Sequence, residues 1–260
     1  MKAILLSLLC CTAVTFTHAQ EVVVGAQGGF GSTWLINNNV SDQAANLDAV
    51  TSFGPVFGIE AGYLFKTTSN VKLGVMVEGN YSVVNQKYTG EDSAYTYTAQ
   101  DQVKYIQVPV LFHLTGKSFF FEAGPQFSFL SNANGKLESS PDVPYFTYAD
   151  RDISAGFKKS VVSIAFGVGG HFNVAPNLYV DTRLRFAYGL TDATVDAGSA
   201  ANRDLAFGVD QQTGIASYYA NRAQKGEYAY KATSLATGHL LVGLTYRIPT
   251  EKKEKSPMPK

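Results

Sequence analysis

The feature that most constrains the fold of this chain is an alternation of apolar and polar residues, repeated along eight segments. A period of two is the period of a β-strand, and each segment is about as long as the ~9–11 residues that a tilted strand needs to cross a bilayer. The apolar face of each segment carries no charge. The segments span residues 22–34, 54–65, 71–83, 103–114, 119–129, 162–172, 178–190 and 240–248.

The connections between these segments alternate strictly between short and long. The long ones cover residues 35–53, 88–101, 131–158 and 191–233, and the short ones are tight turns rich in Gly, Asn, Pro and Ser. An up-and-down barrel with both termini on one side produces this arrangement, and outer-membrane barrels pair short periplasmic turns with long extracellular loops. Aromatic residues also gather at both ends of the segments, as in interfacial girdles. The sequence therefore predicts a transmembrane, up-and-down, eight-stranded antiparallel β-barrel in the outer membrane of a Gram-negative envelope.

Nine charged residues are predicted to share the face opposite the apolar one, and thus the barrel interior. Buried charges persist when they are paired and hydrogen-bonded, so we expect a salt-bridged plug that holds the barrel together. The predicted network consists of Glu60, Lys72, Glu78, Lys104, Glu122, Asp181, Arg183, Arg185 and Arg247.

Two alternatives stay open at this point. Periodicity alone does not say which face is inside, so a secreted soluble β-barrel that binds an apolar ligand would show the same alternation. A charged interior is also compatible with a narrow outer-membrane pore.

The ends of the chain are expected to lie outside the barrel. Residues 1–19 have the short basic start, apolar run and small-residue end of a secretory signal peptide. Cleavage there would remove Cys10 and Cys11, leaving no disulfide. The barrel is predicted to occupy residues 20–248, followed by a disordered polar tail at 249–260.

Composition and motifs argue against several functions. With 21 basic and 21 acidic residues, the chain has no electrostatic case for nucleic acid. His113, His171 and His239 are expected on the inner face in packing roles, and the segment from Asp150 to Gly156 lacks the glycine and glutamate of a calcium loop. No hydrolase or dinucleotide motif is present, so we expect no enzyme activity, cofactor or metal.

The long connections are rich in aromatic residues, which are favoured contact residues because they are large, rigid and amphipathic. We expect a monomeric barrel surrounded by outer-membrane lipid, whose loops either contact envelope or secretion-associated proteins or pack on themselves. These aromatics are Tyr88, Tyr95, Tyr97, Tyr145, Phe146, Tyr148, Tyr218, Tyr219, Tyr228 and Tyr230.

Two neighbouring segments carry a family resemblance. The stretch from Tyr105 to Phe112 reads YIQVPVLF, and the stretch from Phe119 to Phe127 reads FFFEAGPQF. Together they resemble the PorT-like small outer-membrane β-barrel domain family. The resemblance implies an eight-stranded barrel whose activity is mostly undefined, with one branch tied to protein secretion. Pro109 and Pro125 fall inside these strands, where we expect β-bulges to accommodate them.

Overall fold

The computed structural model describes residues 21–37, 48–66, 71–92, 95–142, 147–196 and 230–250. Their secondary structure is almost entirely β. The elements are β1 (Glu21–Ile36), β2 (Asp48–Val50), β3 (Phe53–Lys66), β4 (Lys72–Asp92), β5 (Tyr95–Thr115), β6 (Phe119–Ser140), β7 (Tyr148–Asp152), the short 3-10 helix η1 (Ser154–Gly156), β8 (Ser160–Ala175), β9 (Leu178–Gly189) and β10 (Ser234–Pro249). Within these ranges no helix is long and apolar enough to cross a membrane.

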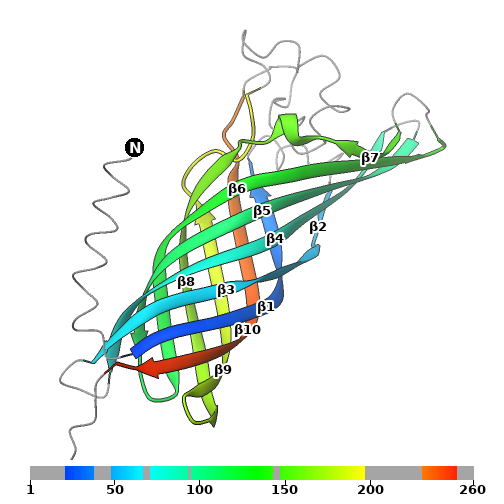
Figure 1. Ribbon diagram of the computed structural model, residues 1–260. Helices are drawn as coiled ribbons and strands as arrows, with labels where there is room; N and C mark the ends of the chain where they lie inside the picture. The colour runs from blue at the N-terminus through cyan, green and yellow to red at the C-terminus, as the bar shows by residue number, and fades with distance from the viewer. Residues whose placement is uncertain are drawn as a thin grey trace, which may run out of the picture.

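Eight of the strands form a closed antiparallel ring. Around the ring the order is β1, β3, β4, β5, β6, β8, β9 and β10, and β1 closes it by pairing with both β3 and β10. The strands are strongly tilted, and Figure 1 shows β1, β3 and β10 crossing the near wall obliquely. This confirms the predicted eight-stranded up-and-down barrel.

The apolar face of the strands points outward. Ile59 is 69% exposed and Phe112 is 64% exposed, although both lie in the middle of long strands. Their neighbours on the opposite face, Glu60 and Leu111, are buried. A wall with this much exposed apolar surface needs hydrocarbon around it. The alternative of a soluble barrel with an apolar lumen is therefore wrong.

Three strands run well beyond the others at the end of the barrel opposite the short turns. Residues 88–101 and 131–158 were predicted as long loops, but β4 continues to Asp92, β5 begins at Tyr95 and β6 continues to Ser140. Two short strands flank this extension, since β2 pairs with β4 and β7 pairs with β6 (Figure 1). The loop prediction was wrong here because strands above the bilayer need no uniformly apolar face, so their alternation is weaker. We call residues 83–92, 95–104 and 132–140 the extracellular sheet.

The two strand prolines are accommodated without bulges. The ladder between β4 and β5 is interrupted near Pro109, and the ladder between β5 and β6 is interrupted near Pro125. In both ladders the register is the same on either side of the interruption, as the pairs Val77–Val110 and Asn80–Gln107 show for β4 and β5. The predicted bulges at these prolines are therefore wrong. The register shift between β5 and β6 lies elsewhere, between Lys104 and Tyr105.

Some of the sequence predictions fall outside the described residues. These are the signal peptide at 1–19, nearly all of the polar tail, and the central parts of the connections at 38–47 and 197–229.

Candidate functional site

The centre of the barrel is occupied by two arginines from β9. Inward-facing positions on a strand are two residues apart, so Arg183 and Arg185 both point into the lumen. Arg185 donates from its two terminal nitrogens to the carboxylate of Glu78, at 2.6 and 2.7 Å, and its Nε lies 2.5 Å from Oε1 of Glu122. Paired donors of this kind match the planar guanidinium to a carboxylate in one fixed orientation. Arg185 thereby ties β9 to β4 and β6 across the lumen.

Arg183 links the same centre to a third strand. Its terminal nitrogens donate to Glu60 on β3 at 3.0 and 3.2 Å, and one of them also reaches Glu78 at 3.1 Å. Gln27 on β1 donates to Glu78 at 2.6 Å. All of these side chains are buried. We call Glu60, Glu78, Glu122, Asp181, Arg183 and Arg185 the central cluster. Together with Gln27, it connects five strands of the ring.

The central cluster contains more carboxylates than guanidinium groups. Glu60, Glu78, Glu122 and Asp181 face Arg183 and Arg185, with Asp181 3.8 Å from Arg183 and held by Thr245 at 2.8 Å. His113 Nε2 lies 3.3 Å from Glu122. Each arginine is consequently shared by several acids. Loss of an arginine would leave more unpaired charge than loss of an acid.

The lumen around the central cluster is nearly filled. Towards the short turns, a cavity of about 30 Å³ is lined by Glu60, His113, Asp181 and Arg183 among others. This is the space of about one water molecule. An eight-stranded barrel is just wide enough for its interior to be filled by side chains, and here charged side chains do so.

The other three predicted network residues form no ion pair with the central cluster among the described residues, although Arg247 lines the same small cavity as Arg183. Lys72 pairs with Glu21 at 2.5 Å and is partly exposed near the short turns. Arg247 lies over the ring of Tyr179 at 4.0 Å. Lys104 was predicted inside, and this is wrong: Val103 and Tyr105 are buried beside it, so alternation places Lys104 on the outer face. The alternation of segment 103–114 already puts Lys104 on the same face as the outward Ile106, and the predicted network overlooked this.

The three histidines are buried on the inner face, and two of them stack on an aromatic ring. Phe120 is stacked between His113 and His171, at centroid distances of 5.4 and 6.2 Å, and His239 is buried. In the described part of the chain, no three His, Cys, Asp or Glu side chains are arranged to hold a metal ion.

Above the central cluster, an apolar cluster occupies the extracellular mouth of the barrel. It includes Tyr88 and Tyr105, each 1% exposed, together with Leu137 and Ile153. Of the aromatics in the long connections, expected either to contact partners or to pack within the loops, Tyr88, Tyr97 and Tyr148 are buried in this apolar cluster. Sequence reasoning missed it, although the alternation of Val84, Gln86 and Tyr88 continues that of β4.

Tyr230 is also engaged within the chain, since its hydroxyl donates to Asp192 and to the backbone carbonyl of Thr194. Of the remaining predicted aromatics, Tyr95 belongs to β5 but its side chain is not among the described parts, and the others lie outside the described residues. They are Tyr145, Phe146, Tyr218, Tyr219 and Tyr228.

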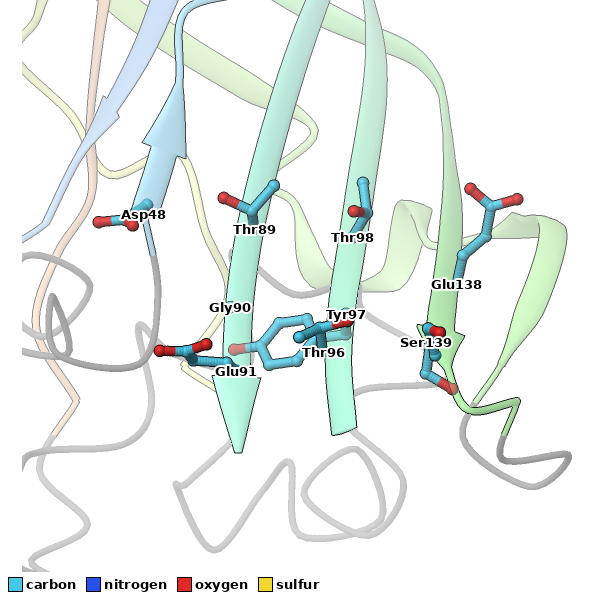
Figure 2. Close-up of a pocket in the computed structure, with 10 residues that line it drawn as sticks. Asp48, Thr89, Gly90, Glu91, Thr96, Tyr97, Thr98, Glu138 and Ser139 are labelled. Atoms are coloured by element: carbon cyan, nitrogen blue, oxygen red, sulfur yellow. The ribbon is translucent and has the colours of Figure 1, made fainter. Parts of the chain in front are cut away.

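The outer face of the extracellular sheet is polar and hollowed near its tip. Figure 2 shows Thr89, Thr98 and Glu138 side by side on β4, β5 and β6, with Asp48 and Glu91 at one side. The open hollow has a volume of about 500 Å³. Hydroxyls and carboxylates dominate its lining, a composition that suits contact with polar molecules outside the cell.

Comparison with known proteins places the chain in a family. The model of the outer membrane protein beta-barrel domain family matches residues 18–195, well over half of the chain. No curated protein matches the sequence.

Three solved structures of similar fold are distant in sequence. A major outer membrane protein from Thermus thermophilus is 14% identical, with a TM-score of 0.44, over 89% of this chain and 100% of that one. Neisserial surface protein A is 11% identical, with a TM-score of 0.34, over 88% and 97%. OprG from Pseudomonas aeruginosa is 8% identical, with a TM-score of 0.39, over 90% and 98%. The family match, the closed ring of eight strands and the apolar outer wall lead to one conclusion: this chain belongs to the outer membrane protein beta-barrel domain family and lies in the outer membrane.

Proposed function

We propose that this protein is a non-conducting outer-membrane barrel, without enzyme activity, that anchors the extracellular sheet as a contact surface for other envelope components. The observation that carries the proposal is the pairing of Arg185 with both Glu78 and Glu122 across the lumen. This pairing supports a closed interior, because it joins side chains of β4, β6 and β9 across the centre of the lumen.

The same interior also supports a structural role over a transport role. A conducting path needs water along the whole lumen, whereas here the central cluster is followed by the apolar cluster at the mouth. Among the described residues, the extracellular sheet extends far beyond the membrane-spanning wall, and its outer face is polar. The proposal includes contact with envelope or secretion-associated proteins. It also includes membership of the PorT-like small outer-membrane β-barrel domain family.

Conductance of the purified mature protein in planar lipid bilayers tests the closed interior. We expect no stepwise current above that of bilayers exposed to detergent alone. Regular ion-conducting steps that increase in number with protein concentration would instead support the narrow pore and refute the proposal.

Site-specific photo-crosslinking in living cells tests the contact role. A photoreactive residue in place of Gln100, which is exposed on the outer face of the extracellular sheet, should give a discrete protein adduct. The matched control is the same residue at Lys117, which is exposed in a short turn at the opposite end. Adducts from neither position, or identical adducts from both, would contradict a contact surface on the extracellular sheet.

A further inference from the structure

A second hollow lies lower on the barrel, where β6 and β8 separate. The last pair between these strands is Phe129 with Ser160, and just above it the backbone N–H of Leu130 donates to the carbonyl of Lys159 at 2.9 Å. The chain before β8 then turns away through η1, whose Ser154 hydroxyl accepts a hydrogen bond from the backbone of Ala133 at 3.0 Å. This leaves an open hollow of about 550 Å³ beside the wall, which we call the seam hollow.

The seam hollow combines positive charge, hydroxyl groups and an apolar floor. Lys158 and Lys159 are exposed at its edge, Ser131 and Ser154 contribute hydroxyls, and Leu130 and Phe157 form apolar parts of its lining. Among the described residues, neither lysine takes part in an ion pair. Its lining residues therefore offer cationic and hydroxyl donors and no carboxylate.

Two of the carboxylates in the loops around the seam hollow are occupied by other groups. Asp152 accepts a hydrogen bond from the backbone of Ser154 at 2.9 Å, and the hydrogen bonds from Ser154 hold the pKa of Asp152 below its usual range. Asp192 accepts hydrogen bonds from Tyr230 and from the backbones of Thr194 and Thr233. These bonds keep both acids tied to their own loops.

The seam hollow lies at the upper edge of the apolar wall. Ile106 and Phe129 pair with each other and are 50% and 47% exposed, and they form the last apolar row on β5 and β6. At the next outward position of β5, two residues from Ile106, Lys104 lies opposite Asn132 of β6. A third lysine therefore stands at the same level, where lipid headgroups meet the barrel.

We propose that the seam hollow binds the phosphate group of an anionic lipid headgroup in the outer leaflet. Lys158 and Lys159 would pair with the phosphate, and the hydroxyl of Ser131 would donate to one of its oxygens. The acyl chains of the same lipid would lie below, along exposed Phe129. Lysine is a common phosphate partner, and an anionic surface attracts basic residues at this depth.

Native mass spectrometry of the folded mature protein in detergent tests this proposal, with bisphosphorylated lipid A and its dephosphorylated form as probes. The variant Lys158→Gln/Lys159→Gln should bind the phosphorylated lipid about 30-fold more weakly, the ratio for about 1 kcal/mol per lysine. The matched control is Lys87→Gln/Lys136→Gln, which removes two lysines from the extracellular sheet farther from the wall and should bind like the wild type.

Three results would overturn the proposal. Equal losses in both double variants would show diffuse attraction instead of a site. Equal binding of the phosphorylated and dephosphorylated lipids would show that the phosphate is not recognised. Displacement of the lipid by millimolar inorganic phosphate would assign the hollow to free phosphate. Heat-modifiable migration on gels should be unchanged in both variants, which confirms that each is folded.

Discussion

Replacing Arg185 with methionine removes the group on which the central cluster most depends. Methionine is unbranched near the backbone and similar in volume, so the lumen stays largely filled. Glu78 loses its two bonds from Arg185, at 2.6 and 2.7 Å, and Glu122 loses the bond at 2.5 Å. Four buried carboxylates then face Arg183 alone as the remaining arginine.

The loss in the free energy of unfolding of Arg185→Met follows from the burial of the carboxylates that it leaves unpaired. Removing one partner of a buried ion pair destabilises a protein by about 3–5 kcal/mol, because the other charge is left without compensation. The control is Lys136→Met, which breaks a pair with Glu138 at a similar distance, 2.7 Å, but with the two side chains 43% and 59% exposed. Exposed pairs of this kind contribute about 0–1 kcal/mol.

Urea unfolding in lipid vesicles, followed by the fluorescence of Trp34, measures both free energies of unfolding. Trp34 is the only tryptophan of the chain. The double variant Arg185→Met/Glu78→Met should lose less than the sum of its two single variants, since the second change removes a stranded carboxylate. If Arg185→Met and Lys136→Met cost the same, the charges are not enclosed as the structure places them.

Four further substitutions give graded expectations under the same unfolding assay. Glu78→Ala should destabilise less than Arg185→Met, because the central cluster keeps both arginines and loses one of its excess acids. Gly25→Ala should cost about 1–3 kcal/mol, as overpacking does, since a Cβ there would lie 2.8 Å from the carbonyl oxygen of Leu244 and 2.9 Å from Oε1 of Glu60. Gly79→Ala, with no atom within 4 Å of the added carbon, should be neutral; a cost equal to that of Gly25→Ala would contradict the packing. Leu137→Ala should cost about 2–5 kcal/mol by opening a cavity in the apolar cluster, and a neutral result would show that the mouth is not packed.

The barrel itself could be predicted from the sequence because a bilayer enforces a strict rule. Every outward residue in hydrocarbon must be apolar, so alternation is sharp along β3, β8 and β10. Charges such as Glu60 and Arg183 then have only the interior left to them. Which acid pairs with which arginine depends on register across five strands, and a single sequence does not contain that register.

The extracellular sheet escaped prediction because the constraint is relaxed above the membrane. Outward residues there are polar, as Thr98 and Gln100 are, while inward positions include Asp101 as well as apolar residues. The period of two persists in the structure, but because both faces include polar residues, the sequence of these strands looks like that of an ordinary polar loop. Lys104 stands at the boundary between these two parts of the sheet, and its outward position there matters for the seam hollow.

The most direct test of the central claim, that the apolar face meets lipid and the charges are enclosed, is a spin-label scan of β10. Single cysteines at each position from Leu240 to Tyr246 would report accessibility to oxygen dissolved in the bilayer. The structure predicts maxima at Leu240, Val242, Leu244 and Tyr246, which are 44–52% exposed, and minima at the residues between them. Maxima at the intervening residues, or no period of two, would contradict the account.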